Sequence, residues 1–266
     1  MTGKTAFSIK DIVTVASVGG GLEMYDFVIY AFFSPVIAKL FFPGQDPLAA
    51  LLAVFAIFAI GYFARPVGGL LFGYYGDKLG RKKLLLLTIS LMAIATTCIA
   101  LLPTYQHIGV AAPLTLVFFR LIQGIAVGGD LPEAIVFVAE HVDRHSRGLY
   151  CGWIYFGVNF GVVLASLIGT LITYFLSPTQ VAQWGWRLSF LFGLVIATVG
   201  FYIRTKTSET PLFLALMESE QLSKMPLRDI FQSNAVQLLK GFGVIVIVAA
   251  VIGQILYFPS YLETVL

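Results

Sequence analysis

The chain has 266 residues, of which 58% are hydrophobic and only 12% are charged, and its formal net charge is +3. A soluble domain with this composition would expose large apolar patches, so the composition excludes an ordinary soluble protein and indicates an all-α membrane protein. The small positive charge does not indicate a nucleic-acid partner. The basic residues stand near the ends of apolar segments, where membrane topology accounts for them.

Seven apolar segments follow one another along the chain. They span residues 12–42, 48–75, 84–102, 109–139, 149–176, 185–203 and 236–262. Each reaches the roughly 17 to 25 residues that a bilayer-spanning helix needs. We expect the first segment to be retained, because no small-residue cleavage site follows a short apolar core.

Lys and Arg alternate between the connections. They precede the first segment and follow the second, fourth and sixth, whereas residues 42–47, 103–109 and 177–185 contain neither. The positive-inside rule therefore predicts a cytoplasmic N-terminus and a C-terminus on the outer (periplasmic) side, in a multi-pass protein of the cell (inner) membrane.

A glycine-rich, charged stretch at residues 73–83 separates the second and third segments. It reads Gly-Tyr-Tyr-Gly-Asp-Lys-Leu-Gly-Arg-Lys-Lys. Glycines between long apolar runs predict a tight hairpin loop between two membrane helices, with its four cations in the cytoplasm.

The longest connection covers residues 205–235. It contains two short amphipathic pieces, one at 211–222 and one beginning at Pro226, which favour helices on the membrane surface. We therefore expect a six-helix domain over 1–204, a cytoplasmic interdomain linker over 205–235, and a seventh spanning helix within 236–266.

Five ordered motifs accompany the charged stretch. They are Glu23-Met-Tyr-Asp26-Phe with Tyr30, Arg65-Pro-Val-Gly-Gly, Arg120-Leu-Ile-Gln123-Gly with Gly128-Gly129, Trp184-Gly-Trp-Arg187, and Glu209-Thr-Pro-Leu-Phe. Together they resemble the major facilitator superfamily, and more narrowly its metabolite:proton symporter branch, which includes proline/betaine, α-ketoglutarate, citrate and shikimate carriers. The resemblance implies twelve helices in two halves. The chain therefore looks truncated after its seventh helix, and a second transporter half becomes a candidate partner.

Glu23 and Asp26 lie three positions apart, so both should project from one face of the first helix, which Gly19-Gly20-Gly21 should loosen. An ionised group at mid-bilayer costs about 2.5–3.5 kcal/mol. Two nearby carboxylates cannot both ionise cheaply, so one should hold a proton near neutral pH, as a proton-coupled carrier requires. The alternative is that both pair permanently with buried arginines.

Arg120 matches the membrane-embedded arginine of the family, and Gln123 follows one turn later. We expect Arg120 to be the counter-ion that Asp26 or Glu23 leaves on protonation or when substrate arrives. A static ion pair between the first and fourth helices is the alternative. Tyr30 could line a transport cavity on the substrate and proton pathway, or it could be a core aromatic residue.

Arg65 lies roughly 18 Å before Asp77 along a helix axis, and hence inside the bilayer. A guanidinium there suits a carboxylate of the substrate or of the first helix, unless it snorkels to the inner surface. Asp130 and Glu133 flank Pro132, which predicts a helix break that lines a cavity. Glu133 could instead be a solvated acid at the helix end.

For the charged stretch, the resemblance implies a cytoplasmic gating motif, in which Asp77 and Arg81 form a latch against the other half. Its remaining members are Gly73, Gly76, Gly80 and Lys82. Within this chain, Asp77 could also cap the next helix or pair with Arg81, Arg144 or Arg147.

The sequence thus predicts a secondary active transporter that couples a proton to a small organic acid or zwitterionic osmolyte. The alternative is a truncated, non-transporting remnant or a regulatory half-transporter. We expect no enzyme activity, no metal site and no cofactor besides the proton, because nucleophilic triads, phosphate loops and metal-ligand clusters are not recognisable. The expected partners are a small solute and the lipid bilayer.

Overall fold

The computed structural model describes residues 9–206 and 209–218, together with 236, 237, 239–241 and 243. The chain divides into two units, Met1–Leu222 and Ser223–Leu266. The described residues of the second unit are helical and exposed. The rest of the seventh apolar segment, 236–262, and the amphipathic piece from Pro226 lie outside the described residues.

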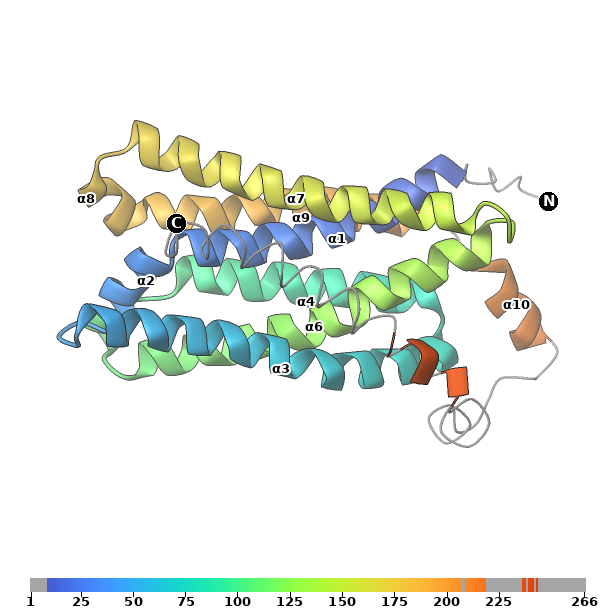
Figure 1. Cartoon of the computed structure of the whole chain (residues 1–266), viewed down its shortest axis with the longest axis horizontal. Coiled ribbons are helices and arrows are strands. Elements are labelled where there is room, and N and C mark those ends of the chain that lie inside the picture. The colour runs from blue at the N-terminus through green and yellow to red at the C-terminus, as the bar shows by residue number, and fades with distance from the viewer. Residues whose placement is uncertain (1–8, 207–208, 219–235, 238, 242, 244–266) are drawn as a thin grey trace, which may run out of the picture. The chain divides into compact units, whose positions relative to one another are not determined.

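The first unit is built from helices alone over its described residues (Figure 1). In chain order these are α1 (Ile9–Phe32), α2 (Ser34–Phe41), α3 (Pro47–Leu79), α4 (Arg81–Leu101), α5 (Tyr105–Ile108), α6 (Ala111–His141), α7 (Arg147–Phe175), α8 (Pro178–Gln180), a π-helical turn η1 (Val181–Gly185), α9 (Trp186–Lys206) and α10 (Pro211–Glu218).

Six membrane-length apolar helices are present in the described part of the chain: α1, α3, α4, α6, α7, and the run from Pro178 to Lys206. They correspond to the first six apolar segments of the sequence, so the prediction of an all-α membrane fold is confirmed. In the bundle α1 packs along α7, α3 packs along α6, and α4 lies between α6 and α9 (Figure 1).

Glycines set the two closest helix contacts. A Cβ atom on Gly161 of α7 would stand 2.0 Å from the backbone oxygen of Gly21 in α1, and one on Gly68 of α3 would stand 1.9 Å from that of Ile125 in α6. Small residues let spanning helices approach to backbone contact. The expected loosening of α1 at Gly19-Gly20-Gly21 is not observed, because α1 is helical throughout this stretch. Because glycine has no side chain, these three positions instead leave room for groups of neighbouring helices.

The first apolar segment, expected as one run over 12–42, is divided at Phe33, where α1 ends and α2 begins. Pro35 lies in the first turn of α2. Proline is suited to a first turn because its nitrogen carries no hydrogen to donate and its φ is already helical. Pro35 is therefore compatible with the start of a new helix at this position.

The hairpin loop expected over residues 73–83 is wrong in extent. Helix α3 continues to Leu79 and α4 starts at Arg81, so Gly80 alone makes the turn. Its φ is +100°, a conformation that residues with a side chain rarely adopt. One glycine is therefore sufficient to reverse the chain, and the remainder of the charged stretch is helical.

The helix break expected at Pro132 is also wrong, because α6 runs from Ala111 to His141 with this proline inside it. A membrane helix tolerates an internal proline where neighbouring helices satisfy the backbone. Asp130 and Glu133 consequently project from one regular helix rather than from an opened segment.

Candidate functional site

Asp26 is fully buried in the middle of the bundle and is held by two neighbouring helices. Thr96 of α4 donates a hydrogen bond of 3.0 Å to Oδ1, and the side-chain amide of Gln123 in α6 donates to Oδ2. The same amide also donates to Thr96 Oγ1 at 2.9 Å. Both carboxylate oxygens of Asp26 therefore have a neutral donor.

Arg120 of α6 faces this carboxylate from a position that is 1% exposed. Its Nη1 lies 3.8 Å from Asp26 Oδ2, and its Cζ lies 3.6 Å from the ring centre of Tyr30. Among the described residues, none of its three nitrogens has a hydrogen-bond acceptor. The contact with Asp26 is thus an electrostatic pair without the bidentate hydrogen bonds that fix a guanidinium on a carboxylate.

Glu23 forms a second acid–base pair, one turn earlier on α1. Its Oε1 lies 3.4 Å from Nη2 of Arg65 on α3. Glu23 is 2% exposed, whereas the Arg65 side chain is 24% exposed. Within the part of the chain that the structure describes, neither oxygen of Glu23 accepts a hydrogen bond, and Nε and Nη2 of Arg65 donate none.

Aromatic rings separate the two pairs. The Arg65 guanidinium carbon lies 4.4 Å from the ring centre of Phe27 and 4.1 Å from that of Tyr62. The Arg120 guanidinium carbon lies 5.9 Å from the same Phe27 ring. Both cations are therefore placed within cation–π distance of one phenylalanine. The structure pairs Arg65 with Glu23 and Arg120 with Asp26.

Asp130 has a different partner, which sequence reasoning missed. It receives two hydrogen bonds from Arg204 of α9, at 2.8 and 3.2 Å, and a third from Thr88 of α4 at 2.7 Å. Arg204 is 1% exposed, although its position after the sixth apolar segment had placed it among the cytoplasmic cations. A Cβ on Gly19 would lie 1.8 Å from Arg204 Nη2, so this glycine in α1 admits the guanidinium. The glycine at position 19 was the one local feature of α1 related to this pair, and the sequence pattern had indicated a loosening of the helix there.

Arg81 contacts three acidic side chains at the end of the bundle where α3 meets α4. Its Nη2 lies 2.5 Å from Asp77 Oδ1, its Nη1 lies 3.2 Å from Glu133 Oε1, and its Nε lies 3.9 Å from Glu140 Oε1. A Cβ on Gly76 would stand 2.6 Å from Glu133 Oε1, which explains a glycine there. Glu133 is 4% exposed, so the alternative of a solvated acid at a helix end is wrong.

Glu209, just before α10, lies at the same end of the bundle and contacts the first turn of α4. Both of its carboxylate oxygens lie 3.2 Å from the backbone nitrogen of Lys82, and the Lys82 ammonium donates to Thr205 O at 3.0 Å. A carboxylate at the first turn of a helix satisfies an otherwise unpaired N–H and complements the helix dipole. Glu209 rather than Asp77 therefore caps α4. Gly73, by contrast, faces open space, because in the described chain no atom lies within 4 Å of the position that a Cβ would take.

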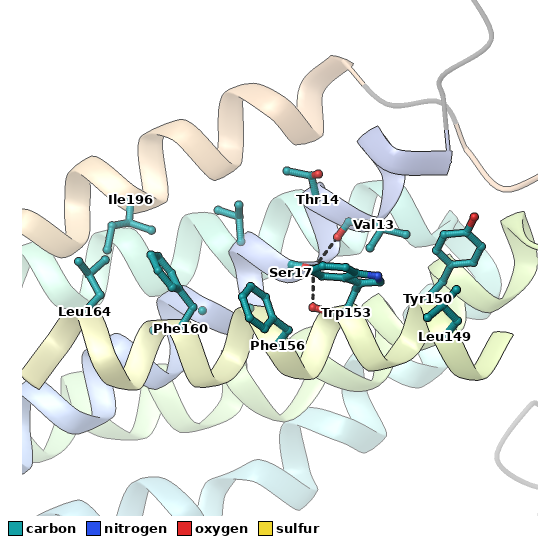
Figure 2. A pocket seen from close by; sticks show the side chains of 14 residues that line it. Val13, Thr14, Ser17, Leu149, Tyr150, Trp153, Phe156, Phe160, Leu164 and Ile196 are labelled. Carbon is teal, nitrogen blue, oxygen red and sulfur yellow. Dashed lines mark hydrogen bonds between the residues drawn. The ribbon is translucent and has the colours of Figure 1, made fainter. Parts of the chain in front are cut away.

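A cavity of about 690 Å³ lies apart from these charges, between α1, α7 and α9. Figure 2 shows Trp153, Phe156 and Phe160 of α7 directed toward it, with Thr14 and Ser17 supplying its polar edge. Ser17 already donates to the backbone oxygens of Val13 and Trp153. The lining is therefore suited to apolar groups, and a charged solute would gain little there.

Potential metal ligands do not gather in the described residues, where no group of three or more His, Cys, Asp or Glu could hold a metal ion. Cys98 and Cys151 are both free thiols of intermediate burial. Neither forms a disulfide.

A bundle of membrane-length helices with acid–base pairs in its interior and a charged glycine turn at one end defines a class, the multi-pass membrane transport proteins. The chain belongs to the sugar (and other) transporter family, whose model matches residues 12–240. This family lies within the major facilitator superfamily, so the resemblance found in the sequence motifs is confirmed.

Two curated relatives illustrate the match. The chain is 36% identical over 265 residues to the proline/betaine transporter of Salmonella typhimurium. This alignment covers 96% of this chain and 53% of that protein. The chain is also 38% identical over 207 residues to the citrate-proton symporter of Klebsiella pneumoniae, covering 78% of this chain and 46% of that protein. The chain thus spans about half the length of these relatives.

The fold matches solved structures of the same superfamily. The xylose transporter XylE from E. coli, in a partially occluded inward open conformation, aligns with a TM-score of 0.74 and 25% identity, over 90% of this chain and 59% of that one. The proton:xylose symporter XylE bound to 6-bromo-6-deoxy-D-glucose aligns with a TM-score of 0.72.

Proposed function

We propose that the chain is the N-terminal half of a proton-coupled secondary transporter, in which residues 1–204 form the six-helix domain, 205–235 the cytoplasmic linker and 236–266 a seventh helix. The cargo is a small organic acid or zwitterionic osmolyte, which agrees with the names of the relatives, a proline/betaine transporter and a citrate-proton symporter. The second half of the transporter is the expected partner.

The observation that carries this proposal is the pair of Asp26 and Arg120. A fully buried carboxylate opposite a guanidinium with no hydrogen-bond acceptor in the described chain is costly to maintain and is suited to a change of charge. When Asp26 takes up a proton, its attraction to Arg120 is lost. Protonation of Asp26 thereby changes the charge balance of the bundle interior, so the pair can couple uptake of a proton to binding of the solute.

The groups at the α3–α4 end serve as the gate in this proposal. Arg81 draws together Asp77 of α3 and Glu133 of α6, with Gly76 and Gly80 giving the space and the turn. We propose that this cluster faces the cytoplasm and contacts the other half when the transporter is open to the outside. Lys82 connects the cluster to the last turn of α9 through Thr205 and to the chain after α9 through Glu209.

The test is proton-driven uptake into proteoliposomes, with the chain reconstituted alone and together with a supplied second half. Glycine betaine, proline, α-ketoglutarate and citrate are offered under an imposed pH gradient. The wild-type chain should accumulate one of them. The Asp26→Asn variant should let the solute reach equal concentrations on both sides without accumulating it, since an amide binds no proton near neutral pH.

Asp46→Asn is the matched control, because it makes the same carboxylate-to-amide change at the N-cap of α3, where an asparagine caps equally well. Unchanged proton-driven accumulation by both Asp26→Asn and Arg120→Gln would contradict the coupling role. If well-folded protein accumulates none of the four solutes in either format, the chain is a non-transporting remnant or a regulatory half.

A further inference from the structure

The two acid–base pairs on α1 differ in access and in hydrogen bonding. Asp26 is fully buried, and both its oxygens accept hydrogen bonds from Thr96 and Gln123. Glu23 accepts none among the described residues, and its partner Arg65 has a side chain that is 24% exposed. A solute can therefore reach the Glu23–Arg65 pair, whose hydrogen-bonding capacity is unused, more readily than the Asp26–Arg120 pair.

We propose that Glu23 and Arg65, with the rings of Phe27 and Tyr62, form the subsite that holds the charged ends of a zwitterionic solute. The carboxylate of the solute takes the place of Glu23 on the Arg65 guanidinium. The cationic end of the solute pairs with the displaced Glu23. This inference rests on the proposed transport function, because it divides the two pairs between solute and proton.

Charge balance favours a zwitterion over an anion at this pair. An anion that displaced Glu23 from Arg65 would leave the Glu23 carboxylate buried without a counter-ion, which is strongly unfavourable. A zwitterion brings its own cation, so one ion pair becomes two and the net charge of the site does not change. Glu23, which is already buried, then keeps a counter-ion throughout binding.

The aromatic rings fit the cationic end. Phe27 and Tyr62 already stand 4.4 and 4.1 Å from the guanidinium carbon of Arg65, and their own ring centres are 5.0 Å apart. A movement of Arg65 toward the solute carboxylate would uncover these faces. A quaternary or primary ammonium group binds such faces through cation–π attraction. Tyr62 is 43% exposed, so a solute can reach this residue without entering the buried core.

The test is equilibrium binding of radiolabelled glycine betaine to the purified chain at pH 7.5 without a gradient, with acetate and choline as single-charge competitors. Wild-type protein should bind glycine betaine, and neither competitor should displace it at equal concentration. The neutral double variant Glu23→Gln/Arg65→Gln should bind it about 10- to 100-fold more weakly, as expected for lost charge-assisted hydrogen bonds. This double variant leaves no unpaired charge, so it is also the variant best able to fold.

The rings are tested by a matched pair of variants. Tyr62→Phe keeps the aromatic face and should bind as the wild type does, whereas Tyr62→Leu should lose about 3- to 30-fold. Asp46→Asn serves as the control outside the site. Thermal unfolding and size-exclusion profiles establish that each variant is folded.

The outcomes separate this inference from the proposed function. If glycine betaine binds the double variant as tightly as the wild type, or binds neither, the subsite is overturned, whatever uptake shows. If the double variant loses binding while the wild type shows no proton-driven uptake, the subsite stands and the transport proposal fails. The Glu23→Gln variant tests the zwitterion assignment. If this variant binds acetate more tightly than the wild type does, and more tightly than it binds glycine betaine, the subsite is an anion site and the zwitterion assignment is overturned.

Discussion

Three buried carboxylates of the bundle differ in how tightly an arginine holds them. Asp130 receives a two-pronged contact from Arg204 at 2.8 and 3.2 Å, whereas Glu23 and Asp26 lie 3.4 and 3.8 Å from their arginines. Bidentate hydrogen bonds fix geometry, and longer electrostatic contacts leave a pair able to separate. We therefore expect Asp130, which the sequence had placed at a helix break lining a cavity, to hold α6, α4 and α9 together.

The role of Asp130 can be measured as stability. Asp130→Asn should lower the free energy of unfolding by about 3–5 kcal/mol, because the Arg204 guanidinium would stay buried with its counter-charge removed. The double variant Asp130→Asn/Arg204→Gln should recover part of this loss. Thermal unfolding in detergent of both single variants and the double variant gives the coupling energy. Additive effects of the two substitutions would show that the pair does not stabilise the bundle.

At the scale of helices, glycine decides where backbones touch. In the α3–α6 contact, a Cβ on Gly128 would lie 2.0 Å from the Arg65 backbone oxygen, and one on Gly124 would lie 2.0 Å from that of Gly61. Such distances are far inside van der Waals contact, so any side chain here forces the two helices apart. Since α3 carries Arg65 and α6 carries Arg120, the spacing of these helices also sets the spacing of the two cations.

Gly128→Ala should therefore destabilise the bundle by about 1–3 kcal/mol or more, as overpacking does in a filled interior. Gly152→Ala is the matched control, because this glycine of α7 has no atom within 4 Å of an added Cβ in the described chain. The control should be neutral or should gain up to about 1 kcal/mol from helix propensity. Unfolding temperatures in one detergent provide the comparison, and equal effects of the two substitutions would contradict the close-contact argument.

The sequence predicted which segments are helices better than where they turn and what they touch. Hydropathy is a local property, so the six described spanning segments could be found from composition alone. The single-residue turn at Gly80 depends on a φ of +100° that glycine permits but does not require. The pairing of Asp130 with Arg204 joins residues 74 positions apart, which spacing along one helix cannot reveal.

Over the whole first unit, charge is distributed unequally between the two ends of the bundle. The end of the bundle at which α3 meets α4, α6 leads to α7 and α9 ends carries Lys78, Arg81, Lys82, Lys83, Arg144, Arg147 and Lys206 in its connections and adjoining helix turns. At the opposite end, the connections from α2 to α3 and from α4 to α6 carry no Lys or Arg, and the adjoining helix turns carry only Lys39 and Arg187. Because basic connections are retained in the cytoplasm, this asymmetry makes the orientation of the bundle a testable property of the whole molecule.

Two cysteine positions at opposite ends of the bundle test the orientation directly. In a background with Cys98 and Cys151 changed to serine, Gln45→Cys lies in the exposed connection before α3, and His145→Cys lies in the exposed connection before α7. A membrane-impermeant maleimide added to intact cells should label Gln45→Cys. It should label His145→Cys only after the inner membrane is opened, since the connection with Arg144 and Arg147 stays in the cytoplasm. The reverse pattern would place the Arg81 cluster outside, where it could not act as the cytoplasmic gate, and would require a different proton path through Asp26.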